Sequence, residues 1–290
     1  MSVALQDFTH FEPRSDADAA APDYAHIELT YVVNCYFNKT DSGSLDELLR
    51  QYAGYSADVL DRVLFVIVDD GSPMPAVIAE DLDLNVLLLR VSVDIAWNLA
   101  GARNLGVAMA RSDKVLMTDL DYVFPESTLR ALVERPSPGK TMFRIHLQAP
   151  DGTPIKRHCN TFFCSRGRFL RFYGYDEEFC GHYGYEDSMF WRWQRYNGTR
   201  FRHLPRRIYG MERRVDYHTL GRDASHNRPI AERKRRDMRV HGPHRGHSRA
   251  FLRFPWTVVL DRTRRAPPPA PRVNRLWGRS WWWRILFPTA

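Results

Sequence analysis

Two hydrophobic segments of the chain each end in a pair of aspartates, and this feature constrains the fold more than any other. The run LFVIV precedes Asp69 and Asp70, and the run VLMT precedes Asp119 and Asp121. Short apolar runs of this kind predict buried strands. The carboxyl ends of parallel strands meet at one edge of a sheet, where open α/β sheets bind their ligands. The pattern predicts an acidic site at that edge, which binds a phosphorylated or nucleotide-linked substrate through a divalent cation.

Strand-like and helix-like segments alternate over the first half of the chain. The predicted strands are rich in aliphatic and β-branched residues and cover 29–37, 62–68, 85–91 and 114–121. An amphipathic helix is expected at 45–53, with Ser44 as its cap, and a helix of small residues at 98–112. This order is typical of βαβ units, and it predicts an α/β fold with a mostly parallel central sheet flanked by helices.

A loop rich in glycine and aromatic residues, at 174–185, leads into Glu186 and Asp187 at the start of a predicted helix. Aromatic faces stack on sugar rings, and a carboxylate removes a proton from a hydroxyl group. The alternative is an acidic turn that caps a tryptophan-rich core helix. If the aromatic rings and the carboxylates act on a ligand, this segment forms a sugar-binding site.

These three motifs, VDDGSP, AGARNLGVAMARSDKVLMTDLD and GYDEEFCGHYGYED, resemble in their order glycosyltransferase family 2, whose members have the GT-A fold. The resemblance spans roughly residues 29–220, and its last segment is similar to β-galactosyltransferase-like and chondroitin-polymerase-like enzymes. It implies a hexosyltransferase-type enzyme that transfers a sugar with inversion from a nucleotide sugar, usually UDP-linked, to a hydroxyl acceptor. Mn²⁺ or Mg²⁺ is the implied cofactor, and polysaccharide or glycolipid assembly is the implied setting.

The resemblance also implies roles for residues beside the donor. Asp69 or Asp70 would hold the base and ribose, with Tyr36 near the base. Arg103 and Asn104 match the RN pair at the start of the helix next to the donor. The first strand departs from the family pattern because it lacks the usual proline before its aromatic–Asn pair.

The remaining implied roles concern the metal and the reaction. Asp121 would ligate the metal, and Asp119 would support the metal or the ribose. His218 matches a metal-binding histidine, with His203 and His226 as rivals for that position. The pair at 186–187 would act on the acceptor: Asp187 as the catalytic base and Glu186 as a contact to the acceptor.

The C-terminal part of the chain differs in charge from the rest. Residues 191–290 contain 25 of the 42 Lys and Arg residues but 6 of the 34 Asp and Glu residues. Such a segment favours anionic partners. The alternatives to a glycosyltransferase enzyme are a nucleic-acid-binding protein and a catalytically silent GT-A scaffold. The first would leave the acidic strand ends unexplained, and we expect no nucleic-acid partner. A nucleotidyltransferase would need a Gly-rich basic loop after the first strand, which NCYFNKTDSGS is not.

The expected organisation has four parts: a disordered segment (1–25), a GT-A domain (26–225), a basic helical extension (226–266) and a proline-rich spacer with an aromatic, basic tail (267–290). The tail has the composition of an interfacial anchor, so peripheral contact with an anionic membrane is expected, and core packing is the alternative. Neither a signal peptide nor an apolar run of membrane-spanning length is evident, which predicts a cytoplasmic protein. The four cysteines form no CxxC pair and are expected to be reduced thiols.

Overall fold

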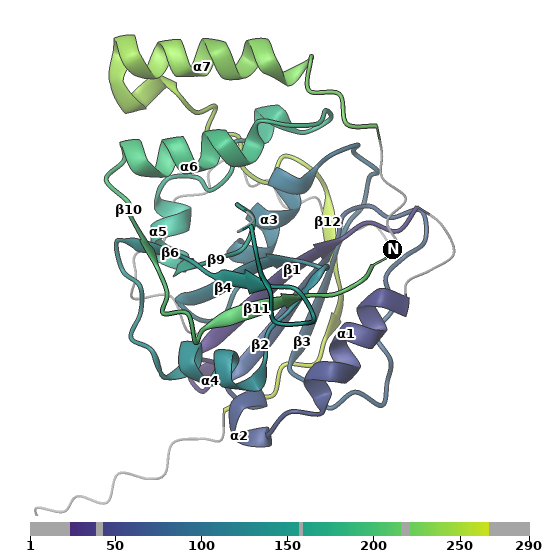
Figure 1. The fold of residues 1–290 in the computed structure, drawn as a ribbon. Coiled ribbons are helices and arrows are strands. Elements are labelled where there is room, and N and C mark those ends of the chain that lie inside the picture. Colours follow the sequence, from purple (N-terminus) through teal and green to yellow (C-terminus); the bar gives the residue numbers. More distant parts are fainter. Residues whose placement is uncertain (1–23, 39–42, 157–158, 216–220, 267–290) are drawn as a thin grey trace, which may run out of the picture.

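The computed structural model describes residues 24–38, 43–156, 159–215 and 221–266. An eight-stranded sheet runs through these residues in the order β10-β6-β9-β4-β1-β2-β3-β12 (Figure 1). Its strands, in sheet order, are β10 (Arg200–His203), β6 (Thr141–Arg144), β9 (Phe162–Ser165), β4 (Lys114–Asp119), β1 (Leu29–Cys35), β2 (Val63–Asp69), β3 (Val86–Val91) and β12 (Trp256–Asp261).

The centre of the sheet is parallel. Strand β1 pairs in parallel with both β2 and β4, and β2 pairs in parallel with β3. Every residue of β1 and β2 is buried, because helices cover both faces of this part of the sheet. The four strands predicted from the sequence are therefore confirmed, as is the α/β fold.

The sheet as a whole is mixed but mostly parallel, as expected: in the described residues four of its seven strand pairs are parallel. Strand β9 runs antiparallel to β4 and β6, and β12 runs antiparallel to β3. The chain reaches β9 without a helical crossover, so a parallel return is not imposed on it. Strand β12 begins beside the carboxyl end of β3, where Trp256 pairs with Val91. It must therefore run toward the amino end of β3, antiparallel to that strand. The sequence segment 226–266 thus begins as a helix but also completes the central sheet.

Helices cover the two faces of the sheet in separate apolar layers (Figure 1). The first face packs on α1 (Gly43–Ala53), α2 (Ala57–Leu60) and α4 (Glu126–Glu134). The second packs on α3 (Leu99–Ala108), α5 (Arg166–Arg171) and α6 (Glu186–Tyr196). Helix α7 (Asn227–His241) forms an outer layer over α6. The described residues also include the 3₁₀ turns η3 (Glu177–Phe179) and η4 (Gly242–Arg245).

A second, four-stranded sheet lies beside the end of β4. Its strands, in order, are β5 (Tyr122–Val123), β11 (Tyr209–Glu212), β7 (His146–Gln148) and β8 (Pro154–Ile155). Strands β7 and β8 pair antiparallel and form a hairpin around the turn APDGTP. Because β5 begins directly after Asp121, its pairing with β11 fixes the backbone that follows the second aspartate pair.

The cysteines and the apolar segments can also be compared with the structure. All four cysteines have free thiols, as predicted, and Cys35 and Cys164 are buried. Among the described residues, no helix has both the length and the apolar composition needed to cross a bilayer.

Candidate functional site

The carboxyl edge of the parallel strands gathers the predicted site residues. In register, Cys35 at the end of β1 pairs with Asp69 at the end of β2, and Asn34 pairs with Asp119 at the end of β4. Tyr36 follows β1 directly, and its hydroxyl donates to the carboxylate of Asp94, 3.2 Å from each oxygen. Asp94 lies just beyond β3, so acidic residues lie at the carboxyl ends of three of the four central parallel strands, β2, β3 and β4.

Arg103 lies at the centre of this edge. Its side chain is fully buried, and its guanidinium donates to Asp119 at 2.8 Å and to Asp187 at 2.9 Å. Its charge also lies over the ring of Tyr175, 5.3 Å from the ring centre. Burial alone would lower the pKa of Arg103, but the charges of Asp119 and Asp187 outweigh burial and raise the pKa above its ordinary value. The arginine therefore stays charged and joins two motifs that lie far apart in the sequence.

The carboxylate of Asp119 is held by protein donors on both sides. One oxygen accepts from Arg103, and the other accepts from the side-chain amide of Asn160 at 2.8 Å. Asn160 precedes β9 and is buried. Asn160 could not be predicted from the sequence, because it belongs to none of the three motifs. Its partnership with Asp119 depends on how β9 pairs with β4.

The adjacent aspartates after β2 have different surroundings. Asp69 accepts from the backbone amides of Ser72 and Ala76, at 2.8 and 3.0 Å, and forms an ion pair with Arg90. It therefore holds the DDGSP turn. Asp70 accepts from the side-chain amide of Asn98 at 2.7 Å.

The ionisation of Asp70 is strongly affected by its position. The side chain is buried, and burial raises its pKa from 3.8 to about 7 against the opposing effect of the Asn98 hydrogen bond. Burial makes ionisation of the Asp70 carboxyl group unfavourable. Hydrogen bonds donated by a ligand would stabilise its charged form.

Asn104 anchors the Gly- and aromatic-rich loop to α3. Its amide donates to the carbonyl of Tyr175 and to the carboxylate of Glu177, both at 2.9 Å, and its oxygen accepts from the Tyr175 amide at 2.8 Å. The backbone of Gly174 passes so close that a Cβ there would lie 2.3 Å from the Asn104 oxygen. The predicted RN pair therefore organises the loop in two ways: Arg103 binds Asp187, and Asn104 binds the segment before it.

Glu186 and Asp187 begin α6, where the positive end of the helix dipole favours carboxylates. Burial, and then the neighbouring charge of Asp187, raise the pKa of Glu186. The Asp187 side chain is 19% exposed, so it is accessible while it is held by Arg103. This arrangement suits a carboxylate that accepts a proton from a bound hydroxyl group.

The predicted metal ligands are brought together only in part. Asp121 lies two residues beyond Asp119, and its backbone carbonyl accepts from the Arg213 amide at 2.9 Å. The described residues contain no group of three His, Cys, Asp or Glu side chains able to hold a metal ion. His218 lies outside the described residues. Of its rivals, His203 is on the edge strand β10, and His226 stacks on His182 with ring centres 3.5 Å apart.

The chemistry of the donors can still be compared with a cation. Carboxylate oxygens are ligands that Mn²⁺ and Mg²⁺ accept. Both oxygens of Asp119 already accept from Arg103 and Asn160, which leaves this carboxylate less capacity to bind a cation. The carboxylate oxygens of Asp119 and Asp121 therefore suit a hard divalent cation, which would need further ligands from outside this pair.

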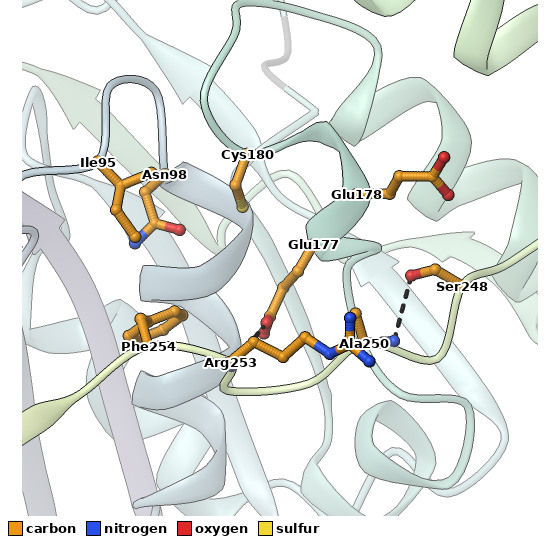
Figure 2. A pocket seen from close by; sticks show the side chains of 9 residues that line it. All are labelled: Ile95, Asn98, Glu177, Glu178, Cys180, Ser248, Ala250, Arg253 and Phe254. Carbon is orange, nitrogen blue, oxygen red and sulfur yellow. Dashed lines mark hydrogen bonds between the residues drawn. The ribbon is translucent and has the colours of Figure 1, made fainter. Parts of the chain in front are cut away.

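A pocket of about 370 Å³ is lined in part by Asn98, whose side-chain amide also donates to Asp70 (Figure 2). Its lining residues are Ile95, Asn98, Glu177, Glu178, Cys180, Ser248, Ala250, Arg253 and Phe254. The Glu177 carboxylate in this lining is occupied by Asn104 and by the backbone amides of residues 252 and 253. None of the predicted site residues lines the pocket, and part of its wall is formed by Arg253 and Phe254 of the segment that leads to β12.

The mixed α/β sheet with carboxylates at its carboxyl edge is the arrangement expected of a GT-A domain. A family model described as glycosyl transferase family 2 matches residues 42–198, more than half of the chain. The chain therefore belongs to glycosyl transferase family 2, which confirms the predicted family and its class, the glycosyltransferase enzymes. A comparison with curated proteins found no match. The likeness of the last segment to particular family members stays a prediction.

Solved structures show a similar fold. Residues 1–349 of S. aureus TarS, in complex with UDP-GlcNAc, align with a TM-score of 0.50 and 16% identity over 66% of this chain and 60% of that one. The mannosyltransferase PcManGT from Pyrobaculum calidifontis, in complex with GDP-Man and Mn²⁺, has a TM-score of 0.44 and 18% identity over 67% and 59%. The chain thus spans about 60% of the length of the TarS structure. At 16% identity the likeness to TarS shows the fold alone.

Proposed function

We propose that this protein transfers a sugar from a nucleotide sugar, UDP-linked in our prediction, to a hydroxyl group of an acceptor, with inversion at the anomeric carbon. The observation that carries the proposal is the bridge from Asp119 through Arg103 to Asp187. It joins the strand edge where family members bind the donor to a carboxylate suited to activate an acceptor. The resemblance in fold to the TarS domain crystallised with UDP-GlcNAc supports the same class of donor.

The donor site would use residues at the ends of β1 and β2. Asp70 would accept hydrogen bonds from the base or ribose of the donor, and Tyr36 would lie beside the base. Asp69 would act by holding the turn, because its carboxylate is occupied by Ser72, Ala76 and Arg90. Ligand hydrogen bonds to Asp70 would stabilise its charged form, which burial otherwise disfavours.

The transfer would be a single in-line displacement. The acceptor oxygen attacks the anomeric carbon from the face opposite the leaving group while Asp187 takes its proton. A bond from acceptor oxygen to carbon forms, and the bond from carbon to the phosphate oxygen breaks. Arg103 would hold Asp187 in position, and Glu186 would bind the acceptor. General-base assistance of this kind contributes about 10²–10⁴-fold.

The cofactor in this proposal is Mn²⁺ or Mg²⁺, held by Asp121, with Asp119 behind it and His218 as the proposed further ligand. When bound, such an ion neutralises the charge that develops on the leaving nucleoside diphosphate. The acceptor is proposed to be a glycan or glycolipid, with the protein in the cytoplasm and in peripheral contact with the membrane through its C-terminal tail.

A donor panel tests the proposal. The purified protein is incubated with Mn²⁺ and a set of UDP- and GDP-linked sugars, and donor binding and consumption are measured by thermal shift and ³¹P NMR. One donor class should raise the melting temperature and release its nucleoside diphosphate. If every nucleotide sugar leaves both the melting temperature and the phosphorus spectrum unchanged, the proposed function is wrong.

A further inference from the structure

Helix α7 lies beyond the residues that match the family model, yet it packs on the elements that carry Glu186 and Asp187. Residues 42–198 match the family, whereas α7 spans Asn227–His241. An apolar cluster joins the two regions through Phe179, Met189, Trp193, Ala231 and Met238. Figure 1 shows α7 lying along α6 as the outermost layer on this side of the sheet.

The loop before Glu186 has a backbone that needs external support. Gly181, Gly184 and Tyr185 have φ angles of +98°, +97° and +73°. Tyr185 has a side chain, so this left-handed conformation is unfavourable for it and persists only when surrounding contacts impose it. Tyr185 is also the residue directly before Glu186. Whatever holds this loop therefore sets the direction in which the two carboxylates leave the backbone.

Asn227, the first residue of α7, makes polar contacts with the backbone of this loop just before Glu186. Its side chain is fully buried, and its amide nitrogen lies within hydrogen-bond distance of three backbone carbonyls. These belong to Phe179 at 3.0 Å, His182 at 2.8 Å and Gly184 at 3.0 Å. The two N–H bonds of this amide thus serve three carbonyls, one hydrogen being shared, in a segment that forms neither helix nor strand around 181–184.

A buried lysine on the same helix holds the start of the loop. Lys234 is 3% exposed, and its ammonium group lies 2.6 Å from both Asp176 and Glu178. Asp176 in turn caps η3 by accepting from the Glu178 amide. Helix α7 therefore binds the loop at two points, at its entry and just before the carboxylate pair.

We propose that Asn227 is a positioning residue for the transfer reaction: its amide fixes the 179–184 backbone and so aims Glu186 and Asp187 at the acceptor. This inference rests on the proposed function, because it assigns Asn227 a role in the same site. It also makes the C-terminal extension, outside the family match, a required part of the active enzyme.

The test compares two buried asparagines that both donate to backbone carbonyls. Asn227→Asp removes the donors and keeps the shape, and Asn227→Ala removes them without adding a charge. The matched control is Asn85→Asp. Asn85 is equally buried, and its amide donates to the carbonyls of Leu60 and Asp61 near the amino end of β3. All variants are made in the full chain, and melting temperature, nucleoside-diphosphate affinity, kcat and KM are measured.

The Asn227 variants should lower kcat by about 10- to 100-fold, because small misplacements of reacting groups are costly. Their affinity for UDP should stay within about twofold of wild type, since the donor residues are untouched. Asn85→Asp should lose a similar amount of thermal stability and keep its kcat. In Asn227→Asp, lowering the pH should recover part of the loss relative to wild type at the same pH, because a protonated carboxyl can donate one hydrogen bond.

Amide hydrogen exchange separates this inference from the proposed function. Exchange of residues 182–187 should accelerate in the Asn227 variants and not in Asn85→Asp, whether or not a donor has been identified. A wild-type protein that transfers no sugar would overturn the proposed function and leave the loop measurement intact. Unchanged loop exchange, or equal losses of kcat in the Asn227 and Asn85 variants, would overturn the positioning role.

Discussion

The guanidinium of Arg103 lies 2.9 Å from the Asp187 carboxylate, and this contact ties the start of α6 to the centre of the parallel sheet. The same guanidinium lies 2.8 Å from Asp119 at the end of β4. A change at the donor edge that moves Asp119 would therefore be transmitted through Arg103 to Asp187. In the proposed reaction, this relationship couples the donor-binding edge to the proposed base through one buried cation.

Removing that cation should destabilise the protein. Arg103→Ala leaves two carboxylates without their common partner, and breaking a buried ion pair costs about 3–5 kcal/mol. Arg130 provides a matched control, because it also bridges two carboxylates, Asp58 and Glu126, but at the surface. Arg130→Ala should leave the free energy of unfolding nearly unchanged. Urea denaturation of both variants checks this, and similar losses in the two would contradict the role given to Arg103.

Metal removal should abolish transfer if Asp121 binds a cation with the donor. EDTA should remove activity, and Mn²⁺ or Mg²⁺ should restore it. Asp121→Ala should weaken binding of the nucleoside diphosphate, measured by calorimetry in the presence of Mn²⁺. Asp83 provides a control, because Asp81 and Asp83 have the same Asp-x-Asp spacing as Asp119 and Asp121 and the Asp83 side chain is 93% exposed. Asp83→Ala should bind normally. Full activity in chelator would rule out the metal.

The raised pKa of Asp70 predicts a pH-dependent stability. Its pKa is raised from 3.8 to about 7, so the native state binds this proton more tightly than the unfolded chain does. The resulting stabilisation is complete below pH 3.8 and is lost as the pH rises through about 7. Asp70→Asn cannot ionise and can still accept from Asn98. Between pH 5 and pH 8 its free energy of unfolding should therefore rise relative to wild type by about 2–3 kcal/mol.

Urea denaturation of wild type and Asp70→Asn at both pH values measures that difference. Parallel pH profiles would show that Asp70 titrates normally in the folded protein.

The predicted membrane tail can be tested by deletion. The described chain ends beside the amino edge of the parallel strands, where the Arg264 amide donates to Asn85 at 2.9 Å. This is the edge opposite the candidate site. Deleting residues 272–290 should release the protein from anionic liposomes in a flotation assay and leave donor consumption unchanged. A truncated protein that unfolds would instead indicate that the tail packs on the core.

The sequence predicted those parts of the fold that depend on local pattern. Strands buried on both faces read as continuous apolar runs, so β1 and β2 were clear. Strand β12 was missed because its residues follow a basic segment, and Val258 and Val259 are exposed on the sheet's edge. Its place depends on the return of a distant segment to β3.

The same distinction holds for the site. The motifs predicted which acidic residues follow the strands, and the structure places them at one edge. The partners of those residues were not predictable, because Asn98 and Asn160 acquire their roles only through long-range packing. Asp94 is different: it follows the third predicted strand, and the rule that marked the other aspartates would have marked it too.

The most direct measurement of the central claim is the effect of Asp187→Asn on binding and transfer, each determined separately. The variant keeps an oxygen that can accept from Arg103 but cannot take a proton from the acceptor. Donor affinity should remain near that of wild type, and the rate of transfer should fall by about 10²–10⁴-fold. Transfer at the wild-type rate, with donor affinity unchanged, would show that Asp187 is not the base and would contradict the proposed mechanism.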